Sequence, residues 1–167
     1  MDAARNRSEW LIAYAPISEP WDPEIAALAP SFLRHYLGRW GVVDADGKPI
    51  PERFARVSAT MNAKAIHTPI LQNTPDNEYL VSLPLYAALR VAKKPVELWV
   101  YPDEYHTKVQ PRHRYSVYER NLDWFRFWLK GEDDPSPAKK DQYERWRKLR
   151  ALHEADRAAA PKGGANP

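Results

Sequence analysis

Cysteine is absent from this sequence of 167 residues, which excludes disulfide bonds, thiolate nucleophiles and cysteine-ligated zinc sites together. A chain without cysteine fits a reducing compartment, so we expect a cytoplasmic protein. Long apolar runs are absent too, and a membrane-spanning helix needs about 18 consecutive apolar residues. The N-terminal region carries scattered charges such as Asp2, Arg5 and Glu9 and lacks the apolar middle of a secretory signal. We therefore expect no membrane contact.

Glycine is scarce, with 6 residues against 16 prolines, as expected of a chain with many stiff connections. A nucleophile elbow needs small residues, normally glycine, two positions before and two positions after its serine, so that a strained turn can expose the hydroxyl. No serine of this chain has glycine at both positions. The sequence therefore contains no nucleophile elbow.

The excess of positive charge is also small, because the chain has 25 basic and 22 acidic residues and a net charge of +3. The basic excess lies mainly in residues 139–157, where acidic residues are interleaved with basic ones. That pattern is typical of a solvated helix with internal ion pairs, and we expect no nucleic-acid partner. The apolar share of 44% and the charged share of 28% are those of a globular protein, and the length suits one domain.

Apolar patterning predicts the elements of an α/β fold. Residues 10–14 form a continuous apolar run typical of a buried strand, residues 23–37 have helical spacing, and residues 43–53 suit a surface loop. The second half predicts a strand at 69–72 that stops at 73–76, a helix at 83–92 and a strand at 96–101. Alternating strands and helices favour a parallel sheet with helices packed on it, since parallel strands need crossover connections.

A loop at 102–112 is followed by an amphipathic helix that ends at Gly131. Its aromatic residues suit packing on the sheet better than base stacking. One helical face is marked by Tyr118, Leu122, Phe125 and Leu129, and the next by Val117, Asn121, Trp124 and Trp128. Residues 133–137 predict a hinge into a last helix, and residues 158–167 should fray. The stripe that should dock this last helix onto the body consists of Tyr143, Trp146, Leu149 and Leu152.

Reactive groups of open α/β sheets cluster in loops at the carboxyl ends of the strands. Asp76 follows the first of the two later strands and His106 follows the second. If both loops lie at one rim, the carboxylate can fix the imidazole tautomer and stabilise the protonated ring, giving an acid–base pair that awaits a nucleophile. The structural alternative is a helix-capping Asp and a polar surface His.

Several segments resemble the closing part of the prolyl-oligopeptidase family of serine peptidases. In that family a strand and a loop with the triad Asp precede a helix, a second strand and a loop with the triad His. Within the family the likeness is greatest to the lasso-peptide isopeptidases, which hydrolyse the ring-closing isopeptide bond of threaded peptides. The segments that carry it are residues 36–38, 51–63, 68–71, 73–76, 85–90 and 94–106, with PDEYHTKVQPRHR, VYERNLDWFRFWLKGEDDP and QYERWRKLR.

The resemblance implies roles for individual residues. It makes Asp76 the orienting acid and His106 the general base. Because Gln72, Asn73, Thr74 and Pro75 replace the glycine-rich lead-in of the family, Asn77 and Glu78 remain alternatives to Asp76, and Asp103 is a further one. No cofactor or metal is implied, and a metal site around His106 and His113 has too few convergent ligands. Residues that we expect to contact a peptide substrate are Glu104, Tyr105, Lys108 and Arg112.

The same resemblance implies the domain organisation. Residues 1–132 form the C-terminal portion of an α/β-hydrolase fold without its nucleophile strand, residues 133–160 a helical extension, and residues 161–167 a disordered tail. The serine and the oxyanion hole then belong to an upstream partner segment, so this chain alone should be inactive and should expose a strand edge near residues 10–14. Two alternatives stay open: a non-catalytic α/β binding module that associates with a partner chain, and a gene relic.

Overall fold

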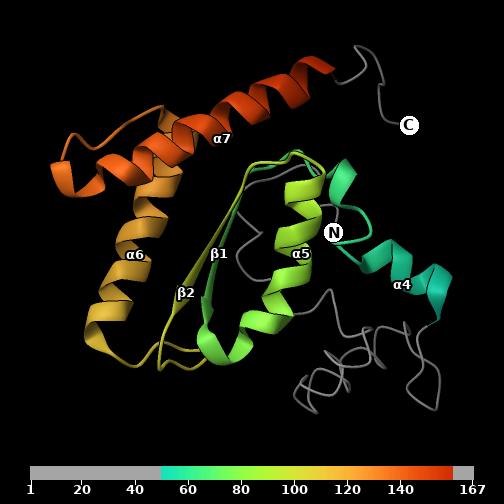
Figure 1. Cartoon of the computed structure of the whole chain (residues 1–167), viewed down its shortest axis with the longest axis horizontal. Helices are drawn as coiled ribbons and strands as arrows, with labels where there is room; N and C mark the ends of the chain where they lie inside the picture. Colours follow the sequence, from blue (N-terminus) through green and yellow to red (C-terminus); the bar gives the residue numbers. More distant parts are fainter. Residues whose placement is uncertain (1–49, 160–167) are drawn as a thin grey trace.

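The computed structural model describes residues 50–159, so the strand expected at 10–14 and the helix expected at 23–37 lie outside the described residues. Two strands lie between helices, as Figure 1 shows. A short helix begins at Pro51, so the loop expected at residues 43–53 is wrong for its last three residues. The helices and strands are α4 (Pro51–Val57), β1 (Ile70–Pro75), α5 (Tyr79–Val91), β2 (Val96–Tyr101), α6 (Pro111–Phe125) and α7 (Lys140–Ala159).

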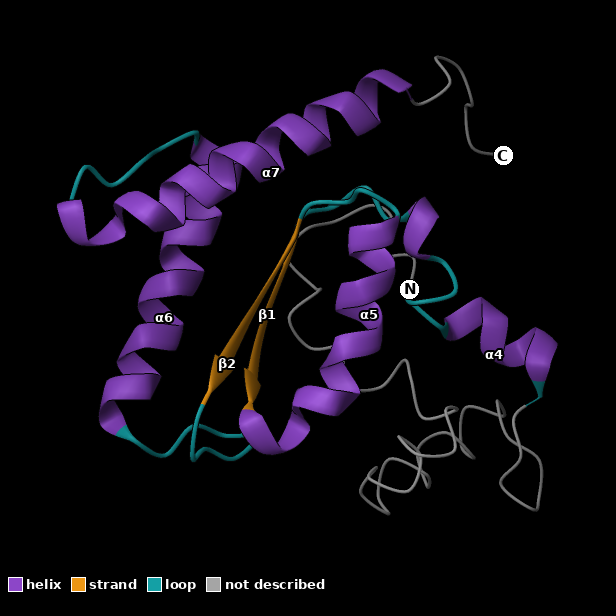
Figure 2. Ribbon diagram, in the orientation of Figure 1, coloured by secondary structure: helices purple, strands orange, loops and turns teal. Residues whose placement is uncertain are grey.

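The two strands are parallel and in full register, from Ile70 opposite Val96 to Pro75 opposite Tyr101. Helix α5 forms the crossover between them, as the alternation of strand and helix predicts (Figure 2). β1 continues through Asn73, Thr74 and Pro75, which we expected to interrupt it. Pairing with β2 holds these three residues extended, so Asp76 follows the strand directly.

Helix α5 begins at Tyr79, four residues earlier than expected, and contains Pro84. A 3₁₀ turn, Asp76–Glu78, joins β1 to this helix. The added first turn is held by burial of Val81 and Ser82. One core cluster lies where α5 covers the sheet, and it includes Ile66, Ile70, Leu85, Leu89 and Val96.

Helices α6 and α7 lie on the other side of the strands from α5 (Figure 1). They share a second core cluster with β1, made of Leu71, Trp124, Phe127, Tyr143 and Trp146. The docking expected of the last helix is therefore confirmed, as is the core role of the α6 aromatic residues.

The expected orientation of α6 is corrected by the structure. Tyr118, Leu122 and Leu129 are exposed, whereas Arg120 and Asp123 are buried with Trp124. The buried charges are paired, because the Arg120 guanidinium lies 3.5 Å from the centroid of the Trp99 ring and Asp123 contacts the Lys139 ammonium at 2.7 Å. A hydrophobicity pattern assigns charged residues to the solvent face and so misplaces a helix whose charges pair inside.

A π-helical segment, Arg126–Lys130, continues α6 and ends at Gly131, as expected. Gly131 has φ +73°, in the left-handed region that glycine adopts without strain. Its N–H donates to the carbonyl of Phe127. Within residues 50–159, none of the helices is long and apolar enough to cross a membrane.

Candidate active site

The loops that follow β1 and β2 meet at one rim of the sheet, because both strands end level at Pro75 and Tyr101. Asp76 joins them. One of its carboxylate oxygens accepts the Asn77 N–H and the other accepts the Asp103 N–H, each at 2.9 Å. Asp103 has φ 51°, a left-handed conformation that Asp tolerates better than most residues. The Asp103 N–H lowers the pKa of Asp76, whose carboxylate is therefore ionised at neutral pH.

His106 extends from the loop after β2 and contacts a different carboxylate. Its Nδ1 lies 3.0 and 3.1 Å from the two carboxylate oxygens of Glu78, the residue that ends the 3₁₀ turn. The His106 side chain is 76% exposed. Among residues 50–159 no hydrogen bond joins Asp76 to His106. The His106 ring thus contacts Glu78, which the sequence left as an alternative to Asp76. The Asp76 carboxylate instead holds the backbone of the same loop at Asp103.

Glu104 is enclosed inside this loop, with its side chain fully buried. Its carboxylate accepts the N–H groups of Val109 and Gln110 at 2.8 and 3.1 Å and contacts Nδ1 of His113 at 2.9 Å. Burial raises the pKa of this carboxyl, but the two N–H groups and the His113 ring outweigh burial and hold the pKa below its ordinary value. Glu104 therefore faces the loop interior, away from any molecule that approaches His106.

The other residues expected at the site belong to the His106 loop or to the first turn of the helix that follows it. Tyr105 is exposed, Arg112 is exposed in the first turn of α6, and the Lys108 ammonium donates to the His106 carbonyl at 3.2 Å. Burial lowers the pKa of Lys108, against the opposing charges of Glu78 and Glu104. This part of the chain thus presents an exposed phenol, an exposed guanidinium and an ammonium that contacts the His106 backbone.

Two supporting residues have roles that the sequence pattern does not predict. His113 reaches back from the first turn of α6 to Glu104, and its ring lies 5.5 Å from that of Tyr101. Asn73 accepts the Tyr101 hydroxyl and donates to Asn121 on α6. The sequence signal that comes nearest to predicting the Glu104–His113 contact is an acidic residue near the start of the loop predicted at 102–112 and a histidine directly after its end. Within the described residues no three His, Asp or Glu side chains gather as metal ligands, and His106 and His113 contact separate carboxylates.

The arrangement supports proton transfer. A carboxylate hydrogen-bonded to one ring nitrogen fixes the tautomer and leaves the other nitrogen available to accept a proton and return it. The exposed ring can be approached by a group from outside the described residues.

Comparison with known proteins shows what this chain is similar to. The model of the prolyl oligopeptidase family matches residues 31–132. The lasso peptide isopeptidase AtxE2 of Asticcacaulis excentricus is 50% identical over 108 residues, which cover 65% of this chain and 16% of AtxE2.

Two solved structures of AtxE2 match as well. One is a serine-to-alanine variant with Astexin3-dC4 bound and the other is the apo form, each with 47% identity and a TM-score of 0.64. The matches cover 71% and 72% of this chain and 18% of AtxE2, so the chain spans less than a fifth of the relative's length.

Proposed function

The chain belongs to the prolyl oligopeptidase family, and from that premise we propose that it supplies the acid–base part of a serine-type peptidase active site. In this proposal His106 accepts the proton of a serine hydroxyl and later protonates the leaving amine. The similarity to AtxE2 supports a finer proposal, that the bond cleaved is an amide or isopeptide bond of a lasso peptide. The observation that carries the proposal is the position of His106 at the rim where Asp76 ties the two strand-end loops together.

We assign the orienting role to Asp76. Its two backbone hydrogen bonds fix the carboxylate at the end of a paired strand, and a carboxylate has about four lone-pair sites, so two remain for the ring. Glu78 is the competing carboxylate, because it contacts His106 in this structure.

The substrate-contact proposal is kept for Tyr105, Lys108 and Arg112. Their phenol and cationic groups come from the His106 loop and the first turn of α6, and they suit a peptide backbone and its acidic groups. Glu104 supports this site indirectly, because it accepts hydrogen bonds from the backbone of the loop that carries His106.

The serine and the oxyanion donors are proposed to come from another segment, since no serine of this sequence lies in a nucleophile elbow. The alternative is a non-catalytic module that binds a partner chain. Mixing the chain with a segment that carries the Gly-x-Ser-x-Gly motif separates them, because hydrolysis supports the peptidase and stable association without turnover supports the module. A fluorophosphonate probe should label no serine of the isolated chain.

In the reconstituted enzyme, Asp76→Asn should lower kcat by a factor on the order of 10⁴, since an amide stabilises the wrong imidazole tautomer. Glu78→Gln should change kcat by less than about threefold, because a contact at the exposed surface contributes little. Steady-state hydrolysis of a lasso peptide measures both, with Asp141→Asn on α7 as the control. The opposite ranking would transfer the orienting role to Glu78, and full activity of both variants would remove this pair of carboxylates and direct attention to Asp103.

A further inference from the structure

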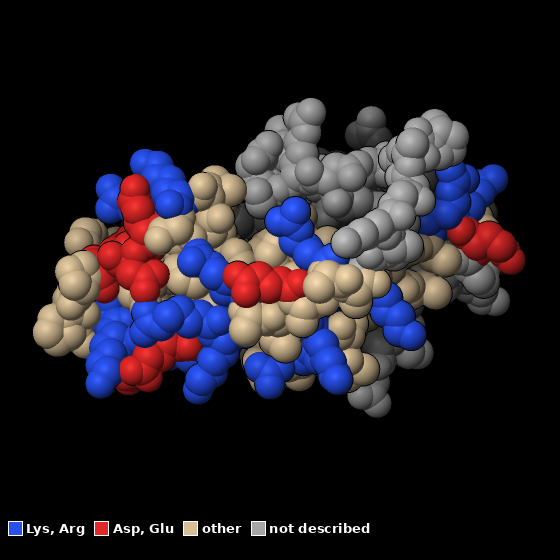
Figure 3. Space-filling model, turned by 90° about the horizontal axis from the view of Figure 1, so that it is seen from above, with Lys and Arg blue, Asp and Glu red and all other residues tan. Residues whose placement is uncertain are grey.

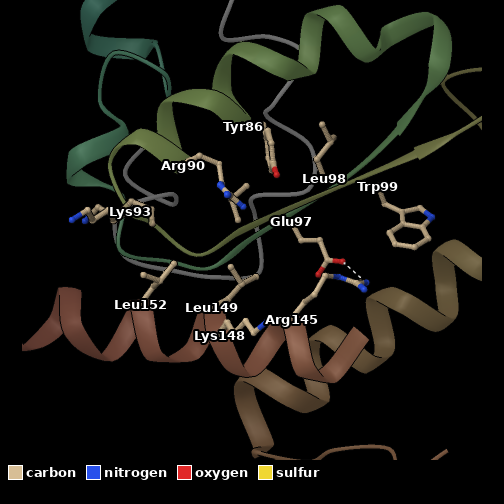
Figure 4. Close-up of a pocket in the computed structure, with 12 residues that line it drawn as sticks. Tyr86, Arg90, Lys93, Glu97, Leu98, Trp99, Arg145, Lys148, Leu149 and Leu152 are labelled. Atoms are coloured by element: carbon tan, nitrogen blue, oxygen red, sulfur yellow. Dashed lines mark hydrogen bonds and ion pairs between the residues drawn. The ribbon is translucent and has the colours of Figure 1, made fainter. Parts of the chain in front are cut away.

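A second concave site lies away from His106, along the edge of β2. A cavity of about 470 Å³ opens between α5, β2 and α7, and Figure 4 shows the side chains that line it. Four consecutive β2 residues, 96–99, contribute to the lining. Side chains of a strand alternate between its two faces, so four consecutive lining residues place the cavity along the strand edge. We call this cavity the β2 groove.

The strand edge in the β2 groove has no strand partner among the described residues. β2 pairs with β1 alone within residues 50–159. An unpaired edge presents a row of N–H and C=O groups, and proteins usually block such an edge with proline, lysine or a covering segment. The β2 sequence VELWVY contains neither proline nor lysine. Its one charge, Glu97, is turned toward α7, where its carboxylate accepts from Arg145 and from the Trp146 indole.

Both walls of the groove combine apolar surface with positive charge. The α5 wall presents Tyr86 and Arg90, with the Arg90 guanidinium 5.8 Å from the Tyr86 ring centroid. The α7 wall presents Lys148 together with Leu149 and Leu152. Figure 4 shows Leu98 on the side of Tyr86 and Glu97 on the side of Arg145. One face of β2 therefore points toward the α5 wall and the other toward the α7 wall.

Within residues 50–159, the basic residues of the groove are only partly matched by acidic ones. Five basic residues line it against the single acid Glu97. Lys94 is held by Asp156 and Arg145 by Glu97, whereas Arg90, Lys93 and Lys148 have no acidic partner within the described part of the chain. Elsewhere on the α7 side, acidic side chains are interleaved with the basic ones, as Figure 3 shows. The unmatched charge thus selects an anionic occupant.

We propose that the β2 groove is a docking site for an extended acidic peptide segment, which adds to β2 as a further strand between α5 and α7. Main-chain hydrogen bonds to the open edge supply affinity, and the two cationic walls select acidic side chains on both faces of the added strand. The four lining residues of β2 span about 13 Å at roughly 3.3 Å per residue, which suits about four paired residues with one flanking residue at each end.

This site is separate from the proposed active site. The groove follows residues 96–99, whereas His106 lies beyond the other end of β2. The proposal therefore does not depend on hydrolysis or on the identity of the orienting carboxylate.

The test uses the full chain and a fluorescein-labelled peptide, Glu-Glu-Val-Val-Glu-Glu, with binding followed by fluorescence anisotropy. In an added strand each wall meets two Glu and one Val of this peptide. The double variant Arg90→Ala/Lys148→Ala should weaken binding at least about tenfold, since each hydrogen bond to a charged group contributes appreciably. The matched control, Arg114→Ala/Lys140→Ala, removes one Arg and one Lys from exposed positions outside the groove and should bind as the unchanged chain does.

Strand addition is tested with peptides methylated at alternate amide nitrogens. One of the two methylation patterns removes the donors that face β2 and should abolish binding, while the other should leave it nearly unchanged. Equal weakening by the groove and control variants would overturn the proposal in favour of general charge attraction. Equal binding of both methylated peptides would overturn it as well, and far-UV circular dichroism checks that the variants are folded.

Discussion

A buried carboxylate, that of Glu104, holds the His106 loop together from the inside. Glu104 accepts two backbone N–H groups and contacts His113, so it replaces the water that would otherwise satisfy these donors. The sequence places Glu104 two residues before His106 and suggests substrate contact for it. Its burial, which depends on how the loop closes onto α6, gives it a structural role.

Replacement of Glu104 by Gln should reduce stability at neutral pH and flatten its dependence on acid. The folded-state pKa of Glu104 is lowered from 4.5, so its contribution is present above that pH and is lost as pH falls through the lower folded value. Urea midpoints between pH 7 and pH 3 should therefore differ most at pH 7 and converge at the acid end. Glu144→Gln, at an exposed position of α7, should leave the profile unchanged, and a constant offset at every pH would contradict the role of the charge.

At the scale of elements, α6 and α7 form one unit through their aromatic rings. Trp146 is fully buried, and its ring centroid lies 5.2 Å from that of Trp124 and 5.6 Å from that of Phe127. Its indole N–H also donates to Glu97 on β2. The last helix is thereby tied to both the neighbouring helix and the sheet.

Trp146→Ala should lower the free energy of unfolding by about 3–5 kcal/mol, the usual cost of deleting a large buried aromatic side chain. Leu129→Ala removes an apolar side chain that is 61% exposed and should cost less than about 0.5 kcal/mol. Urea unfolding followed by circular dichroism measures both. Similar costs for the two variants would show that the aromatic cluster does not stabilise the pair of helices.

At the scale of the whole molecule, one polar cluster connects three distant parts of the chain. The Lys94 ammonium, which is nearly inaccessible to solvent, lies 2.6 Å from one Asp156 oxygen, and Nδ1 of His67 lies 2.6 Å from the other. Burial raises the pKa of Asp156, but Lys94 and His67 outweigh it and hold the pKa low. The end of α7 is thus joined to the segments that precede β1 and β2.

Asp156→Asn should destabilise the protein by about 2 kcal/mol, because it leaves the buried Lys94 charge without its partner. Glu154→Gln lies in the same helical turn but is exposed, so it serves as the control. Hydrogen exchange should show faster exchange of the last two turns of α7 in Asp156→Asn alone. Unchanged exchange there would mean that packing around Trp146 holds the helix end without this cluster.

Most of the described elements and the family of this protein could be predicted from local sequence, although α4, the end of β1 and the start of α5 could not. A nearly continuous apolar run predicted β2, helical spacing and Gly131 predicted α6 and the end of its continuation, and the residue pattern around PVELWVYP carried the family resemblance. These features are local, because strand alternation, helix spacing and a left-handed stop each depend on a few adjacent residues. For the same reason the sequence brought Asp76 and His106 to the ends of neighbouring strands.

The pairing of charged and polar groups could not be read from local sequence and depends on how the chain packs. It buried Arg120 and Asp123 where polarity predicted exposure, closed Glu104 inside its loop, and set His106 against Glu78. Among residues 50–159 it also left one edge of β2 without a strand partner, between two cationic walls. Each of these outcomes joins residues far apart in the chain, and a buried charge is tolerated only when a specific partner reaches it. No periodicity along a sequence carries that information.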